Sequence, residues 1–463
     1  MFSKIITALC GSLALASAYT NDALSDQVTN LPGAENLDIN FNQFSGYLTV
    51  DGSKEMHYWF VESMEDPANA PIAFWTNGGP GCSGLLGFMT EQGPFRPQKD
   101  MSLSLNEYAW NTVSNMVFIE SPVGVGFSYS DNKDDYEADD ASTAALNYAL
   151  IQEFFVRFPE LSKNKMYISS ESYGGHYMPT LAKEIVDMNT AGNNPHLNFQ
   201  GFAVGNPFTE TYSGFPAMLE TYWGHQMVAG PVWSNFQKEC VDTDTRRNLT
   251  KCEALFMDIY MGVGNINPYA VDYPVCLDAV KAPGRAQRHA LLSNLLGDSN
   301  PDLYKAILGS SNYEPCTEDY ASEYLNMASV KEAIHVKSDI KWGMCSYTTR
   351  YKQSDSKNSM VPIYSYLIDG GYDLDILVFS GDDDAVCGTV GVQHWIWELG
   401  YEITGRMWQS YEVAGQMAGY ATKWADAKLG FVTVHGAGHE VPAYKPEVAL
   451  TLWKKYLNGE WTN

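Results

Sequence analysis

The chain has 463 residues, of which 45% are hydrophobic and 18% are charged, so it can bury a sizeable core and wholesale disorder is excluded. Its 55 acidic and 29 basic residues give a formal net charge of -26 at pH 7. Nucleic-acid phosphates and anionic membrane surfaces repel such a chain, which excludes nucleic acid as a partner. The length allows one large domain with an insertion, or two to three smaller domains.

The first 18 residues have the pattern of a secretory signal peptide. Lys4 precedes an apolar stretch over residues 5–15, and Ala16-Ser17-Ala18 supplies small residues at the cleavage spacing. The apolar stretch is too short to cross a bilayer, and no later stretch reaches the roughly 20 apolar residues that a membrane helix needs. We therefore expect a protein of the secretory pathway without a membrane span.

Eight short runs rich in β-branched and aromatic residues predict strands. The first two runs flank Asp51-Gly52, which is a strong hairpin signal. The expected strands are residues 47–50, 56–62, 72–75, 116–119, 165–169, 202–204, 376–379 and 431–434. Helical patterns separate the later runs, at residues 141–157, 177–188 and 446–457. A hairpin followed by alternating strands and helices predicts an α/β fold, with a mostly parallel sheet covered by helices on both faces.

A glycine-rich sequence, residues 77–82 (Asn-Gly-Gly-Pro-Gly-Cys), follows the third expected strand. Glycines let backbone N–H groups approach a ligand closely, which suits an oxyanion hole. An ordinary Gly/Pro turn explains the same sequence equally well. Neither a GxGxxG nor a GxxxxGK[ST] motif occurs, and no CxxC or HExxH spacing indicates zinc, so we expect neither a cofactor nor a metal.

Residues 166–175 run from an expected strand, through a small-x-Ser-x-Gly sequence, into a helical pattern. This is the layout of a nucleophile elbow, in which a strained turn exposes a serine hydroxyl, here that of Ser172. Ser170 occupies the first position of the motif, where glycine is usual. Because such sequences also arise by chance, the interpretation needs a base and an orienting carboxylate.

The alternation of strands and helices breaks off near residue 207 and resumes after residue 327. The stretch between holds four of the seven cysteines that follow the signal, and Asn248 in an Asn-Leu-Thr glycosylation acceptor. We interpret residues 207–327 as a cap inserted between two parts of one core, residues 19–206 and 328–463. The alternative, a separate C-terminal domain from residue 207, is weaker because parallel-strand patterns return only after residue 375.

An acid and a histidine should follow the nucleophile in that order, each on a loop after a strand. Three consecutive Asp residues, 382–384, follow one expected strand, although a run of Asp is also typical of a solvated turn. His435 and His439 enclose Gly-Ala-Gly after the last strand, and these glycines argue against a metal pair on one helical turn. His394 lies in a helical pattern, which favours a packed surface residue.

Several long motifs in this order resemble the serine carboxypeptidases, the family of carboxypeptidase Y and lysosomal cathepsin A. The motifs are Phe44–Leu48, Trp75–Ser83, Glu91–Phe95, Asn111 with Ser121–Ser128, Glu171–Tyr177, Gly381–Asp384 and Gly436–Pro442. The resemblance implies the α/β-hydrolase fold and an enzyme that removes C-terminal residues from peptides and proteins at acidic pH. Its location would be a vacuole, a lysosome or the cell exterior. The sequence does not decide between a monomer and a homodimer.

Matching motif positions carry the family's site residues onto this chain. Ser172 becomes the nucleophile, His439 the general base and Asp384 the orienting acid. The N–H groups of Gly79 and Tyr173 become the oxyanion hole. The residues implied to bind the terminal carboxylate of the substrate are Asn77, Gly78, Glu91 and Glu171, with Trp75 behind them.

Two expectations concern the glutamates at this site. Glu91 and Glu171 would meet the substrate carboxylate in one enclosed space, so at least one of them must be protonated, with a raised pKa. Glu440 directly follows the expected base, where many relatives carry Met. We expect it to face the pocket for the leaving residue and to favour C-terminal Lys or Arg. The alternative is that Glu440 points to solvent.

The family pattern also sorts the cysteines. It implies three disulfides, Cys82–Cys345, Cys240–Cys252 and Cys276–Cys316. Cys387 is left as a free thiol beside the expected acid.

Two rival functions stay open on this sequence. An acyltransferase that uses an activated ester and an alcohol would retain the same triad, although Asn77, Glu91 and Glu171 favour the peptidase. A protective binding partner of other hydrolases would carry the triad incidentally.

Overall fold

The computed structural model describes residues 19–241, 249–264, 266–273 and 317–460. The predicted signal at residues 1–18, the acceptor Asn248, and both Cys276 and Cys316 lie outside the described residues. Across the part that is described, no helix has the length and apolar character needed to cross a membrane.

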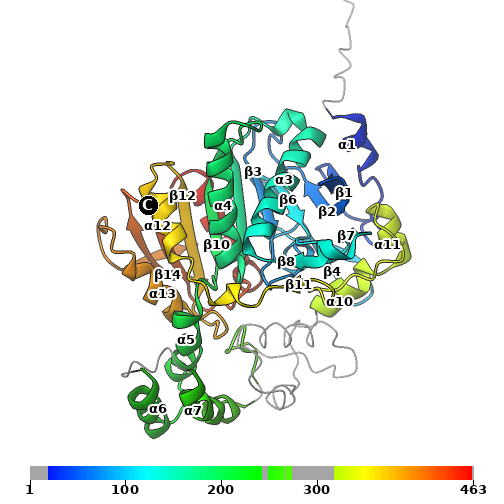
Figure 1. The fold of residues 1–463 in the computed structure, drawn as a ribbon. Coiled ribbons are helices and arrows are strands. Elements are labelled where there is room, and N and C mark those ends of the chain that lie inside the picture. The colour runs from blue at the N-terminus through cyan, green and yellow to red at the C-terminus, as the bar shows by residue number, and fades with distance from the viewer. Residues whose placement is uncertain (1–18, 242–248, 265, 274–316, 461–463) are drawn as a thin grey trace, which may run out of the picture.

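An 11-stranded sheet runs through the middle of the molecule (Figure 1). In chain order its strands are β1 (Gln43–Val50), β2 (Lys54–Val61), β3 (Ile72–Thr76), β6 (Asn115–Ile119), β7 (Tyr129–Ser130), β9 (Met166–Glu171), β10 (Phe199–Gly205), β12 (Asp375–Gly381), β13 (Gln409–Val413), β14 (Gln416–Trp424) and β15 (Leu429–Val434). Across the sheet the order is β1-β2-β6-β3-β9-β10-β12-β15-β14-β13, with β7 paired to β2.

Neighbouring strands in the middle of the sheet pair parallel, in the order β6-β3-β9-β10-β12-β15. On either side, β2 pairs antiparallel with β6 and β14 pairs antiparallel with β15. The predicted hairpin is present: β1 pairs antiparallel with β2, and its turn residues Asp51 and Gly52 both have positive φ, as a type I′ turn requires. Two small separate ladders join β4 (Phe95–Pro97) to β5 (Leu103–Leu105), and β8 (Glu137–Ala138) to β11 (Arg350–Tyr351). The mostly parallel α/β sheet is therefore confirmed.

All eight predicted strands lie where expected, but the hairpin of β13 and β14 was not predicted. Strand β13 is exposed or half-buried along its whole length, so it has no apolar run for a sequence pattern to detect. Strand β13 lies at the edge of the sheet, where it pairs with β14, and β14 pairs with the buried strand β15.

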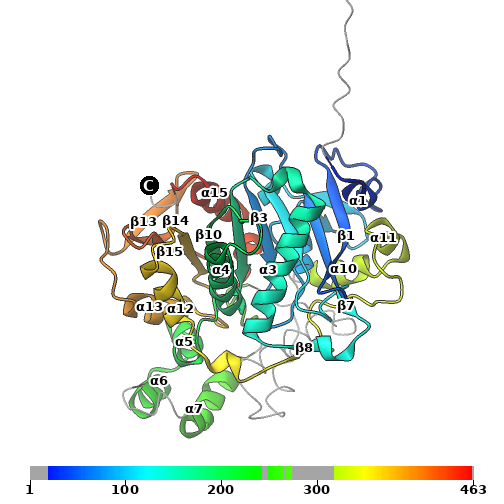
Figure 2. The ribbon, with the colours of Figure 1, turned by 45° about the horizontal axis from the view of Figure 1, so that its top comes forward.

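Helices cover both faces of the sheet (Figure 2). They are α1 (Asn21–Ser25), α2 (Leu85–Thr90), α3 (Asp140–Arg157), α4 (Gly174–Ala191), α5 (Thr211–Gly224), α6 (Gly230–Phe236), α7 (Leu249–Gly262), α10 (Thr317–Leu325), α11 (Ala328–Ala333), α12 (Val361–Asp369), α13 (Thr389–Glu398), α14 (Val441–Tyr444) and α15 (Pro446–Leu457). One apolar core holds Leu150 of α3 and Leu181 of α4, and a second holds Phe88 of α2 and Trp453 of α15.

Helices α5, α6 and α7 lie together outside the sheet, at the lower edge of the molecule in Figure 1. They belong to the predicted insertion, and α5 packs against α13 of the core. Helix α10, near the end of the predicted insertion, packs against α2 and β4. The segment predicted to be an insertion therefore contacts the rest of the chain through α5 and through α10.

Candidate active site

Ser172 occupies a tight turn between strand β9 and helix α4. Its φ is +59°, a left-handed conformation that non-glycine residues rarely adopt, and its side chain is buried. A Cβ on Gly174 would lie 2.2 Å from Ser170 Oγ, so the first turn of the helix passes directly over that side chain. Ser170, in the position where glycine is usual, is therefore accommodated because residue 174 has no side chain.

Asp384 lies in the loop that follows β12, and its carboxylate is fully buried. Its Oδ2 is 2.7 Å from Nδ1 of His439 and accepts a hydrogen bond of 2.9 Å from Nδ2 of Asn206. The backbone N–H groups of Val386 and Cys387 donate to the same carboxylate, at 2.7 and 3.1 Å. These donors fix the carboxylate, and a carboxylate bonded to Nδ1 leaves Nε2 of the imidazole to accept a proton.

Each residue of the Asp run binds a different segment. Asp382 Oδ2 lies 2.8 Å from Nδ1 of the exposed His435, and the carboxylate of Asp383 accepts the N–H of Asp272 at 3.1 Å. Of the three, Asp384 alone bonds the expected base. The solvated-turn interpretation therefore does not describe this loop.

Ser172 and His439 line one small cavity, together with the glycine-rich loop and Glu440. The free thiol of Cys387 is buried beside them. Burial, and then the negative charge of Asp384, raise the pKa of Cys387 well above its usual range. The thiol is therefore neutral and a poor nucleophile.

The two backbone N–H groups expected to form the oxyanion hole come from different elements: Gly79 lines this cavity, and Tyr173 directly follows Ser172. Tyr173 caps the N-terminus of α4, where a helix leaves N–H groups without an intrahelical acceptor. Gly79 has φ +122°, and a Cβ there would lie 2.5 Å from the nitrogen of Gly81. The N–H of Gly81 donates to the Tyr177 hydroxyl at 3.0 Å, which ties this loop to α4.

The amide of Asn77 joins the two expected carboxylate-binding glutamates. Its Oδ1 accepts hydrogen bonds from Trp75 Nε1, at 2.9 Å, and from the N–H of Gly87, at 3.0 Å. This leaves its Nδ2 to donate, and it donates to Glu91 at 2.8 Å and to Glu171 at 2.9 Å. The two carboxyl groups are thus held together on one amide.

Burial and mutual repulsion shift the protonation of this group. Burial first, and then the negative charge of Glu440, raise the pKa of Glu91 to about 7. Burial, followed by the charges of Glu91 and Glu440, raises the pKa of Glu171 well above its usual range. Glu440 is 5% exposed and lines the cavity with Ser172, so it does not point to solvent.

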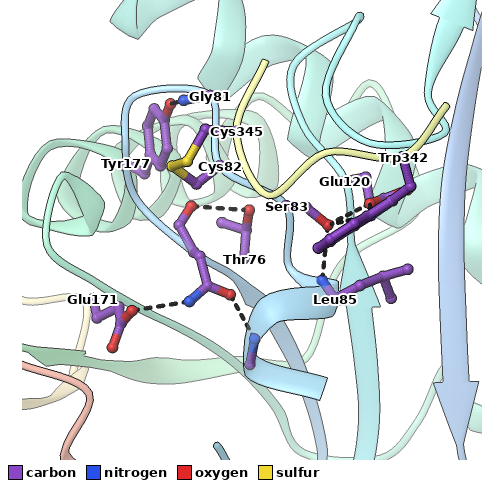
Figure 3. The surroundings of a disulfide bond; sticks show 12 residues. Thr76, Gly81, Cys82, Ser83, Leu85, Glu120, Glu171, Tyr177, Trp342 and Cys345 are labelled. Atoms are coloured by element: carbon purple, nitrogen blue, oxygen red, sulfur yellow. Dashed lines mark hydrogen bonds between the residues drawn. A yellow bond between two sulfur atoms is a disulfide. The ribbon is translucent and has the colours of Figure 1, made fainter. Parts of the chain in front are cut away.

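A disulfide holds the glycine-rich loop to the second part of the core. Cys82 and Cys345 are bonded, as expected, and Figure 3 shows this bond beside Gly81 and Tyr177. The N–H of Ser346 donates to the carbonyl of Gly81 at 2.8 Å. Cys240 is also disulfide-bonded, whereas the side chain of its expected partner, Cys252, lies outside the described part.

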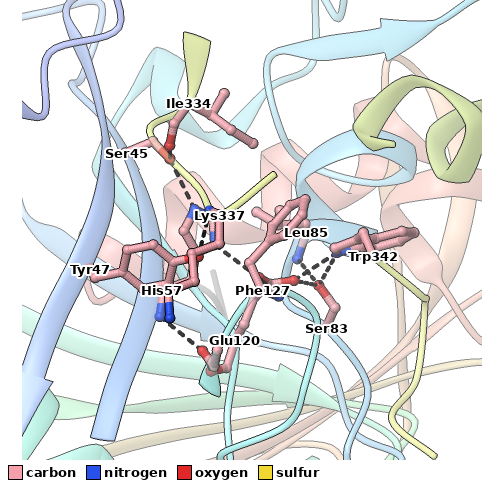
Figure 4. A network of polar contacts seen from close by, with 11 residues as sticks. Ser45, Tyr47, His57, Ser83, Leu85, Glu120, Phe127, Ile334, Lys337 and Trp342 are labelled. Atoms are coloured by element: carbon pink, nitrogen blue, oxygen red, sulfur yellow. Dashed lines mark hydrogen bonds and ion pairs between the residues drawn. The ribbon is translucent and has the colours of Figure 1, made fainter. Parts of the chain in front are cut away.

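A buried polar network, shown in Figure 4, bonds to the end of the glycine-rich loop. Glu120 Oε2 is 2.9 Å from Nδ1 of His57, and neither side chain is exposed. Its Oε1 accepts a hydrogen bond from the Ser83 hydroxyl and another, of 2.7 Å, from Trp342 Nε1. Because Ser83 follows the disulfide cysteine directly, this network fixes the far end of the loop.

Residues 32–459 match the family model described as serine carboxypeptidase. The chain belongs to the serine carboxypeptidase family. It is 35% identical to serine carboxypeptidase-like 26 of Arabidopsis thaliana, over 96% of this chain and 95% of that protein. It is 36% identical to serine carboxypeptidase-like 25 of the same plant, over 95% of this chain and 92% of that protein.

A solved structure shows the shared fold. The crystal structure of Kex1, a prohormone-processing carboxypeptidase from Saccharomyces cerevisiae, matches with a TM-score of 0.74 at 21% identity. The match covers 94% of this chain and 96% of that chain. The α/β-hydrolase fold expected from the resemblance is thereby confirmed.

Two residues that contact the expected triad were not predicted. Asn206 bonds Asp384 and also both the N–H and the carbonyl of Gly381, so it links the ends of β10 and β12. Its position directly after a predicted parallel strand was an available signal, since ligand sites gather at the carboxyl edge of such sheets. Tyr269 lines the cavity from the insertion, and no local sequence pattern places it there.

Among the described residues, two groups of three side chains have atoms that could ligate a metal ion within 4.8 Å of one another. The first is Asp384, Cys387 and His439, whose acid and base already bond each other. The second is His225, Asp272 and Asp383, at the contact between the insertion and the acid loop.

Proposed function

We propose that this chain is a serine-type carboxypeptidase, which hydrolyses C-terminal residues of peptides and proteins through an acyl-enzyme at acidic pH. The observation that carries the proposal is the Asn77 amide, which holds Glu91 and Glu171 together beside Ser172. A free carboxylate on the substrate is the group that protonated glutamates and the backbone N–H of Gly78 can bind. A substrate held in this way presents its last peptide bond to the serine.

The expected chemistry follows from the contacts of the triad. Ser172 Oγ attacks the carbonyl of the last peptide bond while Nε2 of His439 takes its proton. Asp384 holds the imidazole and stabilises its positive charge. The N–H groups of Gly79 and Tyr173 stabilise the oxyanion, and such donors each contribute about 3 to 4 kcal/mol to catalysis.

Collapse of the tetrahedral intermediate breaks the C–N bond. The proton on His439 passes to the leaving nitrogen, and the C-terminal amino acid departs. Water then attacks the ester on Ser172, with His439 again acting as base. This second step regenerates the serine and releases the shortened peptide.

Mass spectrometry of a mixed peptide library tests the proposal directly. The wild-type enzyme should remove residues one at a time from the C terminus. Ser172→Ala should lower the rate about a millionfold, which corresponds to roughly 8 kcal/mol of barrier. Ser234→Ala, a change at an exposed serine of α6, should leave the rate unchanged.

The same experiment separates the rival functions. Transfer of an acyl group to an added alcohol, without hydrolysis of peptides, would identify an acyltransferase. An unchanged library in the presence of enzyme whose Ser172 reacts with a fluorophosphonate would also contradict the peptidase.

A secretory location, in a vacuole, a lysosome or the exterior, belongs to this proposal and follows from the expected signal and the acidic optimum.

A further inference from the structure

A segment of the insertion lies directly on the two loops that carry the acid and the base. We call residues 266–273 the strap. A Cβ on Gly438, next to the base, would lie 2.4 Å from the carbonyl oxygen of Tyr269 and 2.5 Å from the Cβ of Ala270. The strap and the histidine loop are therefore in backbone contact, with no room for a side chain between them.

The strap contacts His439 in two ways. The carbonyl of Tyr269 accepts the backbone N–H of His439 at 2.7 Å. The ring of Tyr269 lies edge-on to the imidazole, with a centroid separation of 5.1 Å. Tyr269 is buried, so its position follows from whatever holds the strap.

The acid loop holds the strap through Asp383. The backbone carbonyl of Asp383 accepts the N–H of Val271 at 3.0 Å, and its carboxylate accepts the N–H of Asp272 at 3.1 and 3.2 Å. The N–H of Ala385 donates to the carbonyl of Pro268 at 2.9 Å. Asp383 is 1% exposed, so its carboxylate is a buried acceptor committed to the strap.

The end of helix α5 completes this contact. His225 caps the C-terminus of the helix, and its Nδ1 lies 3.5 Å from Asp272 and 3.7 Å from Asp383. Asp383 thus joins the acid loop, the strap and α5 at one point.

We propose that Asp383 is a positioning residue for the catalytic base, which it acts on by holding the strap against His439. The inference rests on the proposed triad of Ser172, Asp384 and His439, but not on the identity of the substrate. Asp384 fixes the imidazole of His439 at Nδ1. The strap contacts the same residue through its backbone N–H and through its ring. Loss of the strap contact should therefore impair proton transfer while leaving the carboxylate-binding group in place.

The test uses the full-length protein and two readouts. The first is the rate at which a fluorophosphonate labels Ser172, which needs an oriented His439 but no peptide. The second is kcat and KM for a peptide. Asp383→Ala should slow labelling and kcat by roughly 10- to 100-fold, the effect of displacing a catalytic group by about 1 Å, with KM changed less than threefold.

Conservative and matched variants separate positioning from folding. Asp383→Asn keeps an acceptor for the N–H of Asp272 and should restore labelling to within about threefold of wild type. Asp187→Ala removes a half-buried Asp of α4 that is ion-paired with Lys183 and accepts a hydrogen bond from the Tyr366 hydroxyl, and it should label like the wild type. If Asp383→Ala does not fold, Asp272→Pro removes the same N–H from the side of the strap and should slow labelling similarly.

Each outcome decides one claim. Labelling of Asp383→Ala at the wild-type rate, or a loss in Asp383→Asn as large as in Asp383→Ala, would overturn the positioning role. A rise in KM alone would overturn it too, because it would assign Asp383 to substrate binding. Failure of the wild type to release C-terminal residues, with labelling intact, would contradict the proposed function and leave this test valid.

Discussion

Two carboxyl groups, those of Glu171 and Glu440, line one cavity of this protein, and a third, that of Glu91, is fully buried and shares an amide with Glu171. Glu91 and Glu171 share the Asn77 amide, whereas Glu440 enters from the loop after the base and acts on the other two through its charge. An uncharged pocket for the leaving residue would not need a third carboxylate. We therefore expect Glu440 to select the charge of the leaving side chain.

The test of that role compares C-terminal Arg with C-terminal Leu. A carboxylate in a partly dry pocket pairs with the guanidinium, so Glu440→Met should lower the ratio of kcat/KM for Arg over Leu by roughly tenfold, equivalent to about 1.4 kcal/mol. Glu440→Gln should do the same, because it removes the charge and keeps the volume. Exposed Glu447 provides the control, since Glu447→Gln should leave the ratio as it is. A ratio unchanged by both variants at 440 would show that the residue has no role in selectivity.

The nucleophile elbow shows how two neighbouring elements share their space. Strand β9 carries Ser170 into the turn, and α4 leaves with Gly174 above it. The Ser170 side chain occupies the space that a side chain at residue 174 would need. The two positions should therefore be energetically coupled.

A double-mutant cycle measures this coupling. Gly174→Ala should destabilise the protein by about 1–3 kcal/mol, because its Cβ would lie 2.2 Å from Ser170 Oγ and 2.5 Å from its Cβ. In the background of Ser170→Gly the same change should cost less than about 1 kcal/mol. Urea unfolding of the four proteins gives the free energies. Equal costs in the two backgrounds would mean that the clash is relieved elsewhere.

The elements themselves were largely readable from the sequence, because buried parallel strands such as β3, β6 and β9 are short continuous apolar runs between helices. Helix α15 was predicted with its observed bounds, since Pro446 starts it and its apolar face is regular. The β13–β14 hairpin was missed because β13 buries little. Contacts between distant segments were also not predicted. The position of Asn206 after a parallel strand was an available signal, whereas the contact of Tyr269 with His439 depends on how loops meet at the sheet edge.

On the scale of the whole molecule, the proposed site is a meeting of loops that are far apart in the chain. The glycine-rich loop follows β3, the elbow follows β9, and the acid and base follow β12 and β15. The disulfide between Cys82 and Cys345, with a sequence separation of 263, ties the first of these loops to the second part of the core. Folding of the entire sheet is thus needed before the carboxyl groups can approach one another.

The proposed activity should depend on pH through this group of carboxyls. Burial and the charge of Glu440 raise the pKa of Glu91 to about 7, so Glu91 carries its proton in acid and loses it as the pH rises through neutrality. If Glu91 binds the substrate as proposed, its protonated form donates a hydrogen bond to the substrate carboxylate, whereas its ionised form repels that carboxylate. KM for a peptide should therefore be low near pH 5 and climb above pH 7, approaching tenfold per pH unit.

A matched substrate without the terminal charge isolates the cause. A peptide with an amidated C terminus has no third carboxylate, so its KM should stay flat from about pH 4.5 to 8, while both substrates share any change in kcat due to His439. Glu91→Gln cannot ionise and should flatten the curve for the free peptide. Glu440→Gln removes a charge that raises the pKa of Glu91, so the climb should begin at a lower pH. Parallel curves for the peptide and its amide would show that Glu91 and Glu171 do not bind the terminal carboxylate.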